Sequence, residues 1–98
     1  MTPEFEWNAR KANDNLKKHR VTFEEALTVF ADPLARIFDD PDHSEGESRE
    51  LIIGHSAAQR LLVVSFTERE ARTRIISARE STAQERRDYE QNTQKRTT

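Results

Sequence analysis

The hydrophobic period of this chain changes near residue 35, and this change limits the folds that the chain can adopt. Upstream of it, apolar residues recur with the spacing of helices, and downstream they gather in short runs rich in β-branched residues. The last three runs are joined by links of hairpin length, so we predict an antiparallel meander of three or four strands. The runs are ARIF (35–38), RELIIGHS (49–56), LLVVSFTE (61–68) and TRIISA (73–78).

A first helix is predicted over residues 8–19, with Asn8 as its N-cap. Phe5 and Trp7 precede this helix, and we interpret them as a hydrophobic lid on the core rather than a platform for stacking bases. The helix has one apolar stripe, which is formed by Ala9, Ala12 and Leu16.

A second helix is predicted from TFEEALTVF (22–30). Thr22 and Glu25 have the spacing of a capping box, and Pro33 ends the helix because the residue before a proline avoids helical angles. The apolar stripe of this helix is clearer than that of the first, and it consists of Phe23, Ala26, Leu27 and Phe30.

A third helix is predicted after the last strand, in STAQERRDYEQN (81–92). Ser81 and Gln84 again have capping-box spacing, and the tail beyond Asn92 is expected to fray. The apolar anchors of this helix are few, chiefly Ala83 and Tyr89.

These elements predict one α+β domain over residues 1–98, with an ordered core of about 5–92. Two N-terminal helices come first, then the antiparallel meander, then the C-terminal helix. Apolar residues make up 34% of the chain and charged residues 35%. This composition suits a thin sheet with helices over one face.

The composition also excludes several kinds of chemistry. The chain has no cysteine, which rules out disulfides, thiolate catalysis and cysteine-based zinc sites. Its two glycines cannot form a glycine-rich phosphate loop, and its three histidines show no metal-binding spacing. We therefore expect no metal and no cofactor. No apolar run is long enough for a signal peptide or a membrane span, so the cytoplasm is the expected location.

Charge is unevenly distributed along the chain. Residues 1–48 contain 6 Lys and Arg against 11 Asp and Glu, whereas residues 49–98 contain 10 against 7. Of the 16 basic residues, 12 are arginine, which binds phosphate or carboxylate through two parallel hydrogen bonds. A basic half can bind nucleic acid even when the whole chain is acidic, because binding depends on the electrostatic potential close to the basic residues. A solvated arginine-rich surface is the alternative.

The segment RTRIISARES (72–81) concentrates this arginine around an apolar strand. Simple alternation places Arg72 and Arg74 on one face of the strand together with Ile76 and Ala78. The other face then holds Thr73, Ile75, Ser77 and Arg79. Because the N-terminal helices can cover only one face of the sheet with apolar side chains, an arginine-bearing face is left for solvent or for a polyanion. The alternative is salt bridging, with Glu68 across the hairpin from Arg72 or Arg74.

Two other polar features of the sequence are an acidic run and a histidine at the end of the first helix. The acidic run DDPDHSEGE (39–47) lacks the glycine and glutamate positions of a calcium-binding EF-hand, so we interpret it as a solvated loop. His19 follows two lysines at the end of the first helix. It can act as a general base or phosphate contact, or it can simply satisfy the helix C-terminus.

Several stretches resemble the BrnT toxins of bacterial type II toxin–antitoxin modules. The motifs are KH-x-V-x-FEEA, the aspartate-rich loop, LLVV-x-x-TER and RIISAR, and the similarity covers residues 5–90. The resemblance implies a RelE-like α+β fold, a ribonuclease that arrests translation, and a ribbon-helix-helix antitoxin with which the toxin represses its own operon. Operator DNA would be bound only through the antitoxin. The polar motif residues carried over by position are His19, Arg49, Glu68, Arg69, Arg74, Ser77 and Arg79.

The chain departs from the family pattern in two turns. Arg20 stands where relatives often have glycine, so a left-handed helix cap there would be strained. Glu70 and Ala71 stand where relatives often have Gly-Asp, which makes the tight turn of that hairpin less certain than its strand register.

Our hypothesis for the mechanism is metal-independent RNA cleavage, in which the 2′-hydroxyl attacks the adjacent phosphate. Arg74 and Arg79 would hold the scissile phosphate, and His19 or Glu68 would be the base. The expected further contacts to RNA are Arg49, Arg69, Arg72 and Ser77. The competing hypothesis is a protein-binding module without catalysis, whose arginine face docks an acidic partner.

Overall fold

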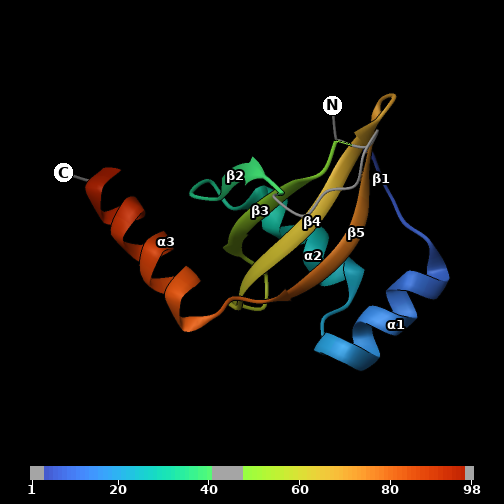
Figure 1. The fold of residues 1–98 in the computed structure, drawn as a ribbon, viewed down its shortest axis with the longest axis horizontal. Helices are drawn as coiled ribbons and strands as arrows, with labels where there is room; N and C mark the ends of the chain where they lie inside the picture. Colours follow the sequence, from blue (N-terminus) through green and yellow to red (C-terminus); the bar gives the residue numbers. More distant parts are fainter. Residues whose placement is uncertain (1–3, 41–47, 97–98) are drawn as a thin grey trace.

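The computed structural model describes residues 4–40 and 48–96 and confirms an α+β fold (Figure 1). The N-terminal part contains β1 (Glu4–Glu6), α1 (Ala9–His19), α2 (Phe23–Thr28) and the 3-10 helix η1 (Val29–Ala31). The strands of the meander and the last helix follow as β2 (Arg36–Asp39), β3 (Glu50–His55), β4 (Leu61–Arg69), β5 (Arg72–Glu80) and α3 (Ala83–Arg96).

The sheet is mixed and has five strands, in the order β1-β5-β4-β3-β2. Strands β2 to β5 form the predicted antiparallel meander. The prediction of a purely antiparallel sheet was wrong, because β1 adds parallel to β5 at its outer edge. Only three residues form β1, too few for a period-two pattern to mark them as a strand.

Helices pack on both faces of the sheet, so the expectation of helices over one face was wrong. One face, called the helix face below, contacts α2 and η1 and holds the main core; Phe5 and Trp7 pack against this core, as the lid interpretation predicted. On the opposite face Tyr89 of α3 packs on the sheet and is 4% exposed. The main core contains Val21, Phe23, Ala26, Val29, Ile52, Leu62, Val64, Phe66, Ile75 and Ala78, and the smaller cluster contains Ile53, Leu61, Val63 and Tyr89.

The predicted caps hold at the first two helices and shift by one residue at the third. Asn8 accepts a hydrogen bond from the Lys11 N–H, and Thr22 accepts one from the Glu25 N–H. The third helix uses Thr82 and Glu85 in place of Ser81 and Gln84. Glu85 N–H donates to Thr82 Oγ1 at 3.1 Å, and Thr82 N–H donates to Glu85 Oε1 at 2.8 Å. No helix in the described ranges is long and apolar enough to cross a membrane.

Asn15 holds α1 to the part of β5 that β1 does not reach. Strand β1 pairs only with residues 72–74. Further along, the Asn15 amide donates to Ala78 O at 2.8 Å and to Val21 O at 3.0 Å, and it accepts from Ala78 N–H at 3.0 Å. The side chain therefore replaces a neighbouring strand. The apolar stripe predicted for α1 missed this, since Asn15 is the buried residue of the helix and Leu16 is 42% exposed.

We predict that Asn15→Ala lowers the free energy of unfolding by roughly 3 kcal/mol, because three backbone groups lose their partner at a buried position. Urea denaturation at neutral pH measures this loss. The control is Asn13→Ala on the exposed side of the same helix, which should change stability little. Equal effects of the two substitutions would contradict the role of Asn15.

Arg20 and Glu70 adopt the left-handed conformation that usually favours glycine. Arg20 caps α1 with φ 60° and ψ 32°, and its N–H donates to Leu16 O at 2.9 Å. Glu70 has φ 58° in the turn between β4 and β5, so the hairpin forms without glycine and keeps its register. Each non-glycine residue in this region carries a steric cost.

Arg20→Gly should raise the free energy of unfolding by about 0.5–1 kcal/mol, because relief of the steric cost outweighs the added entropy of the unfolded chain. Thermal denaturation followed by circular dichroism measures the change. Lys18→Gly, inside the same helix, should have the opposite sign. A loss of stability in Arg20→Gly would show that the side chain contributes more than its backbone conformation costs.

Candidate functional site

A β-bulge in β5 determines which arginines share a face. Ser77 lies opposite Ser65 and Ile75 lies opposite Phe66, so Ile76 is an extra residue without a direct partner. One extra residue reverses the alternation of the strand beyond it. The predicted alternation was therefore wrong for the second half of β5.

The register of β4 shows the result. Arg74 lies opposite Thr67, Ser77 opposite Ser65, and Arg79 opposite Val63. Thr67, Ser65 and Val63 alternate along β4 on the side away from the helix face. Arg74, Ser77 and Arg79 consequently share that side, although simple alternation separated Arg74 from the other two.

We call this surface the arginine face. Arg69 and Arg72 lie opposite each other at its hairpin end. Arg49 precedes β3 and continues the alternation of Leu51, which lies opposite Ser65. Strand β4 therefore lies between Arg49 and β5. The predicted residues on the arginine face are Arg49, Arg69, Arg72, Arg74, Ser77 and Arg79.

Carboxylates already contact three of these arginines. Arg74 Nε lies 3.0 Å from Glu6 Oε2, and Arg72 Nε lies 3.1 Å from Glu4 Oε2. Arg72 and Arg74 therefore do form salt bridges, as the alternative interpretation expected, but not with Glu68. Glu68 instead accepts a hydrogen bond from Thr73 Oγ1 at 3.0 Å. The partners of Arg72 and Arg74 come from β1, the strand that the sequence did not reveal.

Arg79 forms the most complete pair, with Glu85 of α3. Its two terminal nitrogens donate to the two Glu85 oxygens at 2.8 and 2.9 Å. These hydrogen bonds lower the pKa of Glu85 to about 2, against the opposing effect of partial burial, and the Thr82 N–H assists. The same contact raises the pKa of Arg79. Both groups are charged at neutral pH, so any other anion would have to compete with Glu85 for Arg79.

The pair should stabilise the fold only while Glu85 is ionised. Because its pKa is about 2 when folded and its ordinary value is 4.5, the stabilisation is complete above about pH 4.5 and is lost as pH falls toward 2. We predict that Glu85→Gln is less stable than the parent at pH 7 and that this difference shrinks below pH 4.5. Urea midpoints of both proteins between pH 7 and pH 2.5 measure it. A difference that stays constant over this range would contradict the coupling.

The two predicted bases, Glu68 and His19, do not lie on the arginine face. Glu68 lies opposite Thr73, on the side of the sheet that continues the helix face. His19 is half-buried at the end of α1. Neither side chain forms a hydrogen bond or ion pair with Arg74 or Arg79 in the described part of the chain.

Asp40 lies on the arginine face and was missed because we assigned it to the acidic loop. Its N–H donates to Arg49 O at 3.1 Å, so it continues the pairing of β2 with β3. Ser65 Oγ donates to Asp40 Oδ2 at 3.4 Å. Residues 41–47 of the predicted loop, with His43, lie outside the described residues. The pairing could have been found only by extending β2 past its apolar residues.

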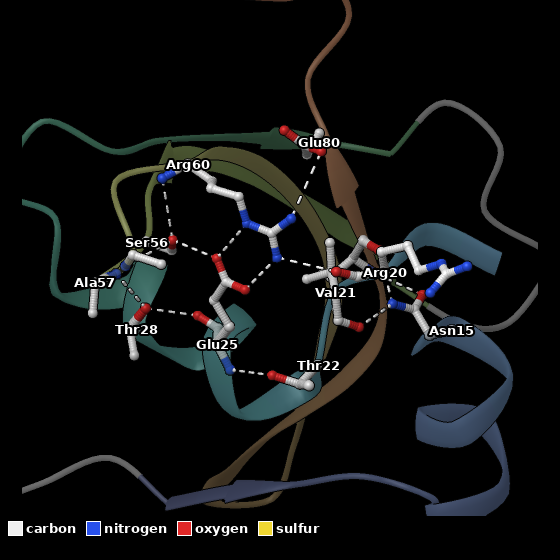
Figure 2. Close-up of polar contacts among 12 residues, drawn as sticks. Asn15, Arg20, Val21, Thr22, Glu25, Thr28, Ser56, Ala57, Arg60 and Glu80 are labelled. Carbon is white, nitrogen blue, oxygen red and sulfur yellow. Dashed lines mark hydrogen bonds and ion pairs between the residues drawn. The ribbon is translucent and has the colours of Figure 1, made fainter. Parts of the chain in front are cut away.

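A second polar network holds α2 to the turn between β3 and β4 (Figure 2). Arg60 contacts Glu25 through two nitrogens, with Nε 2.9 Å from Oε2, and donates to Arg20 O at 3.1 Å. Ser56 Oγ donates to Glu25 at 2.7 Å. The hydrogen bond from Arg60 is the main reason that the pKa of Glu25 is lowered. Not every arginine of the basic half is therefore available to a ligand.

Tyr89 fixes α3 over the arginine face. Its hydroxyl donates to Asp32 Oδ2 at 3.1 Å. Burial is the main reason that the pKa of Tyr89 is raised to about 12, and the Asp32 carboxylate adds to this effect. The same oxygen accepts from His55 N–H at 2.8 Å. A Cβ at Gly54 would lie 2.9 Å from Asp32 Oδ2, which explains the glycine there. The described residues include no group of three or more potential metal ligands.

The fold and this surface define a small α+β protein with an arginine-rich sheet face. A family model described as "Ribonuclease toxin, BrnT, of type II toxin-antitoxin system" matches residues 7–85. The chain therefore belongs to the BrnT family of ribonuclease toxins of type II toxin–antitoxin systems, and membership implies an antitoxin partner.

A solved structure supports the fold. The 1.1 Å crystal structure of the Brucella abortus ribonuclease toxin BrnT is similar with a TM-score of 0.63 and 20% sequence identity. The match covers 83% of this chain and 99% of that one. No match was found among the curated proteins.

Proposed function

We propose that this protein is a metal-independent endoribonuclease whose arginine face holds the RNA backbone, and that it arrests translation by cleaving RNA. The observation that carries the proposal is the gathering of Arg74, Ser77 and Arg79 on one face by the bulge at Ile76. Arginine suits a phosphate because its planar fork donates two parallel hydrogen bonds and keeps its charge.

Arg74 and Arg79 stand on either side of Ser77 along β5. At about 3.3 Å per residue their Cα atoms are at most roughly 16 Å apart, so they meet at one phosphate only by turning toward Ser77. Both guanidiniums now contact carboxylates that are partly exposed, Glu6 at 25% and Glu85 at 32%. RNA phosphate can replace partly exposed carboxylates more readily than buried ones, because less desolvation energy is at stake.

The chemistry assigned to this face is attack of a ribose 2′-hydroxyl on the adjacent phosphate. Arg74 and Arg79 stabilise the negative charge that develops on the phosphorane without any change of protonation. Arg49, Arg69, Arg72 and Ser77 position the strand through contacts to neighbouring phosphates and sugars. Rate enhancement then depends mainly on orientation and electrostatics.

A ribbon-helix-helix antitoxin is the proposed inhibitor, and the complex is proposed to repress its own operon. The support is the family relationship together with the acidity of the contacts seen on the arginine face. Because glutamates already occupy Arg72, Arg74 and Arg79, an acidic antitoxin segment can bind there in the same way. The antitoxin would supply the contacts to operator DNA.

The test is substitution of the two arginines. Arg74→Ala and Arg79→Ala should each reduce RNA cleavage by roughly 10- to 100-fold, because a charge-assisted hydrogen bond to the phosphate is lost. They should also relieve growth arrest in cells while circular dichroism shows a folded protein. Arg10→Ala and Arg86→Ala, at exposed positions on α1 and α3, are the matched controls and should remain toxic. A folded double variant as toxic as the parent would refute the assignment.

The second candidate function is a protein-binding module without catalysis. The observation in its favour is that the arginine face already binds carboxylates within the chain. Incubation of antitoxin-free protein with RNA in EDTA separates the two functions, because fragments indicate an enzyme. Mapping of RNA ends in cells then detects cleavage that requires the ribosome.

A further inference from the structure

We infer that Asp40 is the general base of this site, an inference that rests on the proposed ribonuclease function. The hydrogen bond from Asp40 N–H to Arg49 O marks a backbone-bonded pair between β2 and β3. Residues on β2 that alternate with this position, Phe38 and Arg36, lie opposite Leu51 and Ile53. Because Leu51 in turn lies opposite Ser65, Asp40 belongs to the arginine face.

The carboxylate reaches the middle of that face. Asp40 Oδ2 accepts a hydrogen bond from Ser65 Oγ on β4, and Ser65 lies directly opposite Ser77 on β5. Opposed residues have Cβ atoms about 5 Å apart, so the carboxylate lies one strand from Ser77. Along this face of β5, Arg74 lies on one side of Ser77 and Arg79 on the other. A phosphate held between those arginines would therefore lie beside Asp40.

This position supplies what the two predicted bases lack. Glu68 lies on the other side of the sheet, opposite Thr73, and His19 ends a helix that packs at the edge of β5. A general base must come within hydrogen-bond reach of the proton that it removes. Asp40 is a carboxylate on the same face as the arginines, and its Oδ2 already accepts from a hydroxyl there.

Asp40 takes the proton of the 2′-hydroxyl while the 2′-oxygen forms a bond to phosphorus. The bond from phosphorus to the 5′-oxygen breaks, and the 5′-oxygen keeps its electron pair and takes a proton from water. The products are a 2′,3′-cyclic phosphate and a 5′-hydroxyl, and Asp40 then returns its proton to solvent. The arginines hold the phosphorane charge throughout.

The neighbouring aspartate provides a matched control. Asp39 lies opposite Glu50, which lies opposite Phe66 of the main core, so Asp39 faces the other side of the sheet. Asp39→Asn and Asp40→Asn make the same chemical change one residue apart on opposite faces. Only the change on the arginine face should affect catalysis.

The experiment measures single-turnover cleavage of an RNA transcript by purified, antitoxin-free variants at neutral pH. Asp40→Asn should reduce the rate by roughly 10²- to 10⁴-fold and bind RNA within about twofold of the parent. Asp39→Asn should match the parent. Added formate should restore part of the rate to Asp40→Ala and none to Arg79→Ala, a rescue that a merely structural role would not give.

The results distinguish failure of the base assignment from failure of the proposed ribonuclease function. If the parent cleaves RNA and Arg79→Ala is impaired, an active Asp40→Asn, or an Asp40→Ala that formate does not rescue, overturns the base assignment alone. If neither purified RNA nor RNA mapped in cells is cleaved by the parent, the proposed function fails and the assignment of Asp40 fails with it. Where circular dichroism shows that Asp40→Asn does not fold, the formate rescue of Asp40→Ala tests the base assignment.

Discussion

The arginine face depends on one extra residue, Ile76, in the last strand. Without the bulge, Arg79 would point toward the helix face and would meet the core instead of solvent. With it, Arg74, Ser77 and Arg79 share one surface while Ile75 and Ala78 both remain buried. The strand therefore packs an apolar core on one side and presents guanidinium groups on the other. A β-bulge beside a functional surface commonly has this effect.

Two polar anchors keep this strand and its surroundings in place. Asn15 bonds to Ala78 beyond the bulge, where β1 no longer covers the outer edge of β5, and Tyr89 holds α3 through Asp32. Because Glu85 in the first turn of α3 binds Arg79, the position of the helix and the contacts of the arginine are linked. The glutamates on this face contact the guanidinium groups, and a phosphate bound as proposed would have to displace them.

Most of the scaffold could be predicted from the sequence, since the strands of the meander and two of the three helix caps depend on local pattern. The capping box at Thr22 and the cap at Asn8 are local hydrogen bonds that short motifs encode.

The features that could not be predicted depend on contacts between residues distant in sequence. Strand β1 is recruited by the free edge of β5, and Asn15 is buried because Ala78 needs a partner. The bulge at Ile76 leaves no mark in the alternation of residues 72–80, so the predicted faces were wrong beyond it. Asp40 was hidden by the acidic residues that follow it.

Binding of the RNA backbone by the guanidinium groups of the arginine face can be measured by nuclear magnetic resonance of the arginine side chains. A titration with an oligonucleotide that lacks the 2′-hydroxyl, and so cannot be cleaved, would be followed through the Nε–Hε signals. The signals of Arg74 and Arg79 should shift as these side chains exchange Glu6 and Glu85 for phosphate, while that of Arg60, held by Glu25, should not. Unchanged Arg74 and Arg79 signals, with shifts confined to Arg10 or Arg86, would contradict it.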